Sequence, residues 1–114
     1  MIELIGDGGH AAVIRDLIRA RERLDRSGNI AREEGMIVAV GDNRARKREA
    51  EARPTARWTY LIHPSATVAS SALIGMGTVI MAGAVVQARA VIGAHCILNS
   101  SCSVDHDCVL DDFV

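Results

Sequence analysis

Hydrophobic and polar positions recur with a period of six over residues 61–114, which divide without gaps into nine six-residue units. A helical spacing near 3.6 residues does not produce this period, so the pattern predicts a repeat architecture. The second position of every unit is aliphatic: Ile62, Val68, Ile74, Ile80, Val86, Ile92, Leu98, Val104 and Leu110. The sixth position is small or β-branched: Ala66, Ala72, Thr78, Ala84, Ala90, Cys96, Cys102, Cys108 and Val114.

This repeat predicts a parallel β-helix. Each unit is expected to form a short strand with its aliphatic side chain inward and then to turn at the small residue. Three six-residue units would close one coil, and coils would stack at the strand-pairing distance of roughly 4.8 Å. Residues eighteen apart, such as Val68, Val86 and Val104, should then lie above one another. A single coil cannot bury its own interior, so contacts between neighbouring coils must stabilise the stack.

The first 60 residues show a different pattern, which begins with an apolar strand at residues 2–5. A glycine turn follows at residues 6–11 with the spacing G-x-G-x-x-A, found in nucleotide-binding strand-to-helix units. Such a turn lets the backbone approach a phosphate at the start of a helix. The spacing alone leaves a ligand-binding turn and a tight turn without ligand equally open. Apolar residues at helical spacing then predict a helix that ends at residues 27–29: Val13, Ile14, Leu17, Ile18 and Leu24.

A second strand and helix are predicted at residues 36–40 and 44–52. Asp42 or Asn43 is the expected N-cap of this helix. Residues 57–60 are expected to form a third strand or the first edge of the β-helix, which makes a βαβαβ unit with a parallel sheet. The basic residues of the second helix are interpreted as a solvated face: Arg44, Arg46, Lys47 and Arg48.

Composition narrows the possible functions. The formal net charge of −1 gives no field that would attract nucleic acid, and three aromatic residues are too few for a base-stacking platform. Apolar runs are far shorter than the roughly 20 residues of a membrane span, and the N-terminus lacks the features of a signal peptide. We therefore expect a cytoplasmic protein that binds neither nucleic acid nor membrane.

The three cysteines occupy the sixth position of successive units, where they are interpreted as small buried hydrophobic residues. A zinc site is disfavoured because the late histidines and cysteines lack the C-x₂-C spacing of structural sites. No metal is therefore expected. The residues concerned are His95, Cys96, Cys102, His106 and Cys108.

Asp105, His106 and Asp107 place three polar groups in a unit where other units carry small or apolar residues. From these residues alone, a solvated corner is the favoured interpretation. The alternative is a general base, since the reference pKa of histidine, about 6.5, lies close to working pH and a neighbouring carboxylate can fix its tautomer.

The glycine turn, the GDN sequence at 41–43, the IHPSA sequence at 62–66 and the six-residue units together resemble the sugar O-acyltransferase family typified by sialic acid O-acetyltransferases. The resemblance extends to the acetyl-CoA-dependent N-acetyltransferases of UDP-4-amino-sugars and GDP-perosamine. It implies a Rossmann-like domain at 1–60 that holds the nucleotide-sugar. It also implies a left-handed β-helix at 61–114, here of three coils, that forms a homotrimer and performs the chemistry. The handedness comes from the resemblance, because ordinary parallel crossovers are right-handed.

The same resemblance implies roles for individual residues. The sequence NSSCSVDHDC at 99–108 matches the family segment whose catalytic histidine falls on His106, with Asp107 as the acid that orients it. The expected reaction is acetyl transfer from acetyl-CoA to a nucleotide-linked amino sugar, in surface polysaccharide or glycan biosynthesis, with His106 as general base. The residues expected to bind the substrate are Gly8, Gly9, His10, Asp42, Asn43 and Asn99.

Two departures from the family pattern limit this expectation. Residues 25–35 are too short and too polar to supply the second strand and paired acids that contact the nucleotide, so the identity of the nucleotide stays open. The family continues for several more coils, which contain the oxyanion donor and much of the acetyl-CoA site. Residues 1–114 are therefore expected to be a fragment or a shortened relative that lacks part of the active site.

Two other classes of function stay open. One is a non-catalytic β-helix module that trimerises or binds a nucleotide-sugar without acetyl transfer. The other is a metal enzyme of the γ-carbonic-anhydrase kind, which uses histidines at subunit interfaces. The presence of only His95 and His106 in the late units disfavours the metal enzyme.

Overall fold

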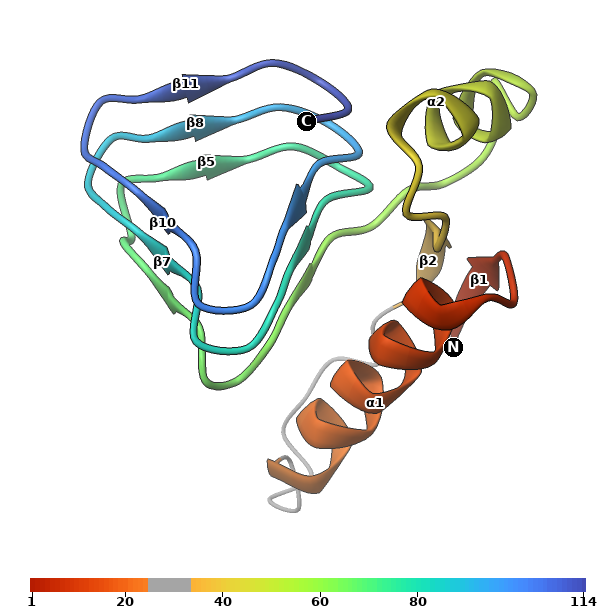
Figure 1. Ribbon diagram of the computed structural model, residues 1–114, viewed down its shortest axis with the longest axis horizontal. Coiled ribbons are helices and arrows are strands. Elements are labelled where there is room, and N and C mark those ends of the chain that lie inside the picture. Colours follow the sequence, from red (N-terminus) through yellow and green to blue (C-terminus); the bar gives the residue numbers. More distant parts are fainter. Residues whose placement is uncertain (25–33) are drawn as a thin grey trace.

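The computed structural model, which describes residues 1–24 and 34–114, places a small α/β part beside a triangular prism (Figure 1). The α/β part contains β1 (Ile2–Ile5), α1 (Gly9–Leu24), β2 (Gly35–Val38) and α2 (Asn43–Glu51). Strands β1 and β2 pair in parallel, as the sequence predicts. The expected end of the first helix at residues 27–29 lies outside the described residues.

The prism, residues 61–114, consists of two-residue strands at six-residue intervals. They form three parallel sheets, in the orders β3-β6-β9, β4-β7-β10 and β5-β8-β11. Paired residues are eighteen apart in sequence, so Val86 pairs with both Val68 and Val104 as predicted, and the stacked triplets fit a left-handed β-helix. The strands are β3 (Leu61–Ile62), β4 (Thr67–Val68), β5 (Leu73–Ile74), β6 (Val79–Ile80), β7 (Val85–Val86), β8 (Val91–Ile92), β9 (Ile97–Leu98), β10 (Ser103–Val104) and β11 (Val109–Leu110).

The corners of the prism turn one residue earlier than expected. In seven successive units the fifth residue, and not the small sixth residue, adopts a left-handed backbone with φ between 54° and 82°. The small sixth residue then points into the core, where Ala84, Ala90 and Cys96 are fully buried. A left-handed backbone costs non-glycine residues about 1–2 kcal/mol each, a cost that the stacked core must offset. The corner residues are Gly77, Gly83, Arg89, His95, Ser101, Asp107 and Phe113.

The α/β part covers one outer face of the prism. Outward-facing Leu61 and Val79 of the β3-β6-β9 sheet share a buried cluster with Ile14 and Leu17 of α1 and with Ile37 of β2. Each fully buried aliphatic side chain of this kind contributes about 1.5–3 kcal/mol. The two parts are therefore joined by a common hydrophobic core.

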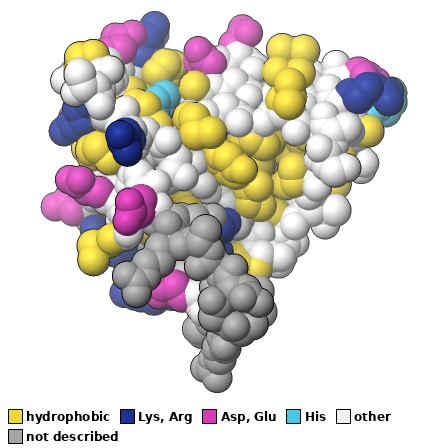
Figure 2. Space-filling model, turned by 180° about the vertical axis from the view of Figure 1, so that it is seen from behind, with side chains coloured by type: hydrophobic (Ala, Val, Ile, Leu, Met, Phe, Trp, Pro, Cys, Tyr) yellow, Lys and Arg dark blue, Asp and Glu magenta, His cyan; other side chains and the backbone are white. Residues whose placement is uncertain are grey.

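The end of the prism that begins at Leu61 is less well covered than its middle. The inward residues of the first three strands, Ile62, Val68 and Ile74, are only partly buried, whereas Ile80 and Val86 of the next strands are almost fully buried. From behind, hydrophobic side chains gather over the middle of the prism (Figure 2). The middle strand of each sheet is the best buried because a strand pairs with it on each side.

Residues 57–60 were expected to form a third strand or the first edge of the prism. Trp58 forms a single parallel bridge with Met36, and the Thr59 carbonyl accepts a hydrogen bond from Gly77 of the prism, eighteen residues further on. The prediction that all three cysteines are buried was wrong. Of the cysteines expected to be buried, only Cys96 is; Cys102 is half-buried and Cys108 is exposed. Within residues 1–114, no residue follows Cys108 by eighteen positions to cover it.

The prediction that Arg46 belongs to a solvated face was also wrong. Arg44, Lys47 and Arg48 are exposed as expected, but the Arg46 side chain is buried against the prism. Helix α2 begins at Asn43 with Asp42 as its N-cap, which confirms one of the two expected caps. One turn of helix then places Arg46 between the helix N-terminus and the prism.

Candidate active site

His106 lies in the turn between β10 and β11, and its side chain is 73% exposed. Its Nδ1 is 2.8 Å from Oδ2 of Asp107. Because an ionised carboxylate can only accept, Nδ1 carries the proton and the neutral ring keeps Nε2 as a free base. The hydrogen bond and charge of Asp107 raise the pKa of His106 above its ordinary value, with a smaller contribution from the charge of Asp105.

Arg89 holds the other side of the Asp107 carboxylate. Its Nε and NH2 atoms donate to Oδ1 and Oδ2 across 2.7 and 2.8 Å, a bidentate arrangement. The hydrogen bonds from Arg89 and His106 keep the pKa of Asp107 well below its usual range, so the carboxylate is ionised at neutral pH. Beneath Arg89, the Ser71 hydroxyl accepts a hydrogen bond from the Arg89 backbone N–H. Ser71, Arg89 and Asp107 thus form a polar column at the corner that carries His106.

Sequence reasoning missed Arg89, although a signal for it was present. Arg89 precedes Asp107 by eighteen residues, which is the stacking distance that the repeat predicts. The His106–Asp107–Arg89 arrangement has the parts of a general base held by an oriented carboxylate.

The residues expected to hold a nucleotide-sugar gather where α1 and α2 begin. Gly8 and Gly9 are exposed, and a Cβ built on either glycine would meet nothing within 4 Å. His10 follows in the first turn of α1, and its Nε2 is buried without a hydrogen-bond partner among the described residues. Burial, and then the charge of Arg46, lower the pKa of His10. A Cβ at Gly41 would lie 3.7 Å from Cβ of His10, so the two turns are adjacent.

Asp42 and Asn43 each accept one hydrogen bond from within α2. Asp42 Oδ2 accepts from the N–H of Ala45 at 2.8 Å, and Asn43 Oδ1 accepts from Arg46 at 2.6 Å. Both side chains are exposed, so each carboxylate or amide keeps further hydrogen-bonding capacity for a ligand. The structure therefore brings the predicted residues His10, Asp42 and Asn43 together with Arg46, which was not predicted to belong to a site.

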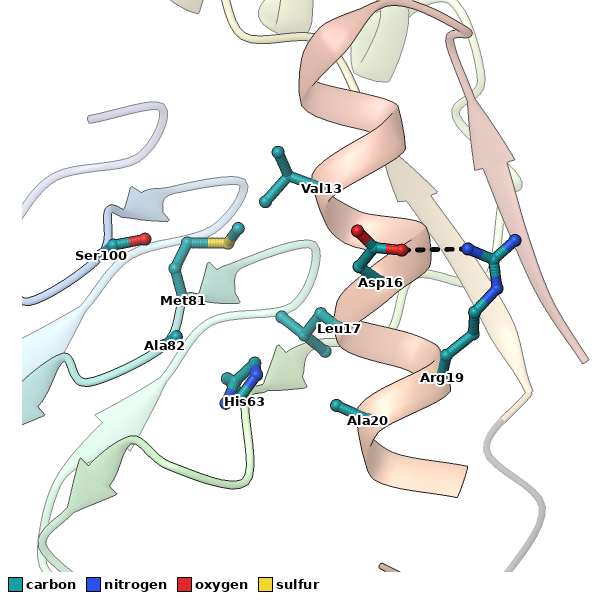
Figure 3. Close-up of a pocket in the computed structure, with 9 residues that line it drawn as sticks. All are labelled: Val13, Asp16, Leu17, Arg19, Ala20, His63, Met81, Ala82 and Ser100. Atoms are coloured by element: carbon teal, nitrogen blue, oxygen red, sulfur yellow. Dashed lines mark hydrogen bonds and ion pairs between the residues drawn. The ribbon is translucent and has the colours of Figure 1, made fainter. Parts of the chain in front are cut away.

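Asn99 lies after β9, at the corner that faces α1. Its Oδ1 accepts from the N–H of Ser100 at 2.9 Å. Beside this corner, a pocket of about 390 Å³ opens between α1 and the prism (Figure 3). This volume falls within the usual range for small-molecule sites. The pocket is lined by Val13, Asp16, Leu17, Arg19, Ala20, His63, Met81, Ala82 and Ser100.

The pocket combines apolar and polar groups. Leu17 of α1 and Met81 of the prism face each other across it, and His63 lies below them on the prism side (Figure 3). The backbone N–H of Ser65 donates to Nδ1 of His63 at 3.0 Å, so the neutral ring carries its proton on Nε2. His63 can therefore donate a hydrogen bond through Nε2.

One chain does not bring all the predicted residues together. The turn with His106 lies at the corner of the prism away from the α/β part, whereas Asn99 and the two glycine-rich turns lie on the side of the α/β part (Figure 1). Within the described ranges 1–24 and 34–114, no group of three or more His, Cys, Asp or Glu side chains has the geometry to hold a metal ion. In the same ranges, no helix is long and apolar enough to cross a membrane.

Solved structures closely match the chain. The acetyltransferase domain of PglB from Neisseria gonorrhoeae FA1090 superposes with a TM-score of 0.84 at 35% identity, over 98% of this chain and 68% of that chain. The same domain in complex with acetyl coenzyme A superposes with a TM-score of 0.82 at 36% identity, over 98% of this chain and 67% of that chain. PerB from Caulobacter crescentus, in complex with CoA and GDP-perosamine, superposes with a TM-score of 0.83 at 30% identity, over 99% of this chain and 66% of that chain.

The chain thus spans about two thirds of the length of each of these structures. No protein-family model matches the chain, and neither does any curated protein.

Proposed function

Since the chain belongs to the hexapeptide-repeat family of sugar acetyltransferases, we propose that it transfers an acetyl group from acetyl-CoA to a nucleotide-linked amino sugar. The observation that carries this proposal is the His106–Asp107 pair, in which Nε2 of an exposed histidine is left as a free base. PglB and PerB, at 30% identity or more, have been solved with acetyl coenzyme A, and with CoA and GDP-perosamine. We place the reaction in the cytoplasm, in the synthesis of surface polysaccharide or glycan.

His106 acts as the general base in this proposal. Nε2 removes a proton from the acceptor amine or hydroxyl while that group attacks the thioester carbonyl. The tetrahedral intermediate then expels the CoA thiolate, which takes the proton held by the His106 imidazolium and leaves as the thiol. Asp107 keeps the ring oriented and stabilises the imidazolium, and Arg89 keeps Asp107 ionised and in place.

The acceptor is proposed to lie along α1. Its diphosphate would meet the free N–H groups at the start of α1, near Gly8 and Gly9, with His10, Asp42 and Asn43 around the nucleotide. Its sugar ring would enter the pocket beside Asn99, where Leu17 and Met81 offer apolar surface and His63 and Ser100 offer hydrogen-bonding groups. In this division, residues 1–60 form a Rossmann-like domain and residues 61–114 form three coils of the β-helix.

A second copy of the chain completes this site, since His106 lies at another corner from Asn99. The outer face of the β5-β8-β11 sheet, next to the His106 corner, exposes a row of aliphatic side chains. Leu73, Val91 and Val109 are 65%, 37% and 70% exposed. Such a row is typical of a protein interface. We propose a homotrimer in which this face packs on a neighbour and brings His106 to the neighbour's acceptor site.

The test is CoA release from acetyl-CoA in the presence of UDP- and GDP-linked 4-amino-sugars. His106→Ala should lower kcat by about 10²–10⁴-fold, the usual contribution of a general base. Because the side chain is exposed, the thermal midpoint and the assembly state should not change. Turnover within about threefold of wild type would rule out the base role. Binding of nucleotide-sugar without any acetyl transfer by the wild-type protein would instead indicate a non-catalytic module.

A further inference from the structure

Arg46 is the most deeply buried charged residue among those the structure describes, with a relative exposure of 1%. Its guanidinium donates hydrogen bonds to four acceptors. Nε donates to the His95 carbonyl at 2.7 Å, and NH1 donates to the carbonyls of Val40 and Gly41 at 3.2 and 3.0 Å. NH2 donates to Oδ1 of Asn43 at 2.6 Å.

All four acceptors are neutral. In the described part of the chain, Arg46 takes part in none of the ion pairs. Burial lowers the pKa of Arg46, because desolvation disfavours the charged guanidinium, while Cys96 and then Asp42 act in the opposite direction. An apolar side chain of similar volume would fill the same space without desolvating a cation. The forked shape and five donors of arginine therefore explain why an arginine is buried at position 46 better than packing does.

The four bonds join three segments. Val40 lies just after β2, Gly41 and Asn43 belong to the turn that begins α2, and His95 belongs to the prism. The His95 end of this connection is rigid, because its ring stacks on Phe113 with centroids 5.1 Å apart and meets the edge of Trp58 at 4.8 Å. Arg46 thus ties the 40–43 turn to a fixed corner of the prism.

The same turn borders the proposed nucleotide site. His10 packs against Gly41, and its Nε2 is buried without a partner in the described residues. The Arg46 charge contributes to lowering the pKa of His10, which keeps the ring neutral at physiological pH. Arg46 therefore acts on three of the proposed ligand-binding residues: His10, Asp42 and Asn43.

We propose that Arg46 is a positioning residue for the nucleotide-sugar, which holds the 40–43 turn beside His10 and at a fixed place on the prism without touching the ligand. This inference rests on the proposed function, because it takes the turn and His10 as the ligand site. It assigns to one buried guanidinium the fixed placement of the nucleotide-binding turn on the prism.

The test compares Arg46→Lys with Arg44→Lys, a matched change at an exposed arginine of the same helix. Lysine keeps the charge but cannot form the fork, so Arg46→Lys should raise KM for the nucleotide-sugar at least tenfold. Its kcat and its KM for acetyl-CoA should stay within threefold of wild type. Arg44→Lys should change none of these values. Arg46→Met, if it folds, should show the same selective rise in KM.

Two outcomes for Arg46→Lys would overturn the proposal. One is a lower thermal midpoint with an unchanged KM for the nucleotide-sugar. The other is an equal rise in the KM for the nucleotide-sugar and the KM for acetyl-CoA. Amide hydrogen exchange without ligand tests the geometry directly. It should accelerate at residues 41–45 in Arg46→Lys and stay unchanged in the strands of the prism; unchanged exchange at 41–45 would also overturn the proposal.

Calorimetric titration with UDP and GDP separates this inference from the proposed function. If wild type binds a nucleoside diphosphate but transfers no acetyl group, the proposed function fails, and weaker binding by Arg46→Lys still supports the positioning role. If wild type binds neither nucleotide and transfers no acetyl group, both proposals fail.

Discussion

His106 donates its Nδ1–H to Oδ2 of Asp107 across 2.8 Å, and this hydrogen bond defines which nitrogen of the ring can act as a base. The Asp107 carboxylate cannot turn away from the ring easily, because Arg89 holds both of its oxygens. The three side chains are exposed, so their ion pairs contribute little to stability.

The first prediction concerns the pH profile of acetyl transfer. Asp107 raises the pKa of His106 above the ordinary value of 6.5, and a general base works only when it is unprotonated. We therefore expect kcat/KM to rise with pH, with a midpoint above 6.5. Asp107→Asn should lower both this midpoint and kcat. Asparagine suits the test because residue 107 has φ 62°, a left-handed backbone that asparagine tolerates.

Asp105→Asn is the matched control for this profile. Asp105 affects the pKa of His106 only through its charge, and less than Asp107 does. Asp105→Asn should shift the midpoint of the pH profile less than Asp107→Asn does. It should leave kcat within about threefold of wild type, since the substitution removes no hydrogen bond to the base. Equal midpoints in wild type and Asp107→Asn would contradict the assigned role of Asp107.

The second prediction concerns Arg89. Arg89→Gln removes a positive charge from the neighbourhood of His106, so protonation of the ring becomes easier and the midpoint of the pH profile should move upward. At pH 7, kcat/KM should fall, but less than in Asp107→Asn, because the carboxylate remains next to the ring. The thermal midpoint should not change, since the pair is exposed. A midpoint that moves downward would contradict this prediction and would show that the main effect of Arg89 is to hold Asp107 against the ring, since loss of the Asp107 hydrogen bond lowers the pKa of His106.

Sequence reasoning succeeded where one period controls many positions. Val68, Val86 and Val104 could be placed in one column because every coil must fill the same interior. The corner conformation could not be predicted in the same way, because the residues that share it have no common chemistry: among them are Gly77, His95 and Phe113. At these corners the stacking of the strands imposes the left-handed backbone conformation, and the conformational preference of the individual residue does not.

Arg46 and Arg89 illustrate two different limits. Arg89 could have been identified from the eighteen-residue spacing to Asp107. Arg46 could not, because it stands among the exposed basic residues of a short helix, and only the packing of α2 against the prism distinguishes it. Local sequence describes a helix face, whereas burial of that face depends on a segment 49 residues away.

The third prediction tests the proposed interface. Leu73→Lys and Val109→Lys each place a charge in the exposed aliphatic row of the β5-β8-β11 face. In the double variant we expect the trimer to dissociate and acetyl transfer to be lost, while the circular dichroism spectrum stays that of the wild type. Ser103→Lys, an exposed outward position on the β4-β7-β10 face, is the control and should remain trimeric. Light scattering that shows a monomeric wild type, or a trimeric double variant, would contradict this interface.

The fourth prediction concerns stability and pH. Burial, and then the charge of Arg46 from α2, lower the pKa of His95, while Asp112 opposes this effect and the neighbouring rings of Trp58 and Phe113 carry no charge. The unfolded chain therefore binds a proton at a higher pH than the folded chain does. Stability should be complete above pH 6.5 and should decrease as the pH falls below it.

His95→Asn removes this titration and keeps a residue that tolerates the left-handed backbone of position 95. We expect the variant to be less stable than wild type at pH 8, because it loses ring packing, but to lose less stability between pH 8 and pH 5.5. Some dependence should remain, since burial also lowers the pKa of His10. Parallel stability curves for the two proteins, measured by urea unfolding, would count against this role of His95.

The last prediction compares two glycines that share a left-handed backbone, Gly77 with φ 82° and Gly83 with φ 69°. Alanine at either position should cost about 1–2 kcal/mol for the backbone alone. At Gly83 the new Cβ would lie 3.2 Å from the Ser101 hydroxyl, which is exposed and can move. At Gly77 it would overlap the buried ring of His95, whose ring already stacks on Phe113.

Gly77→Ala should therefore destabilise the protein by about 3 kcal/mol or more, the range for overpacking added to backbone strain, and Gly83→Ala by about 1–2 kcal/mol. Urea unfolding of both variants measures the difference. In a His95→Asn background the cost of Gly77→Ala should fall toward that of Gly83→Ala, because the ring that the methyl group displaces is absent. Equal costs for the two glycines in the wild-type background would show that the stacking of His95 over Gly77 does not constrain the corner.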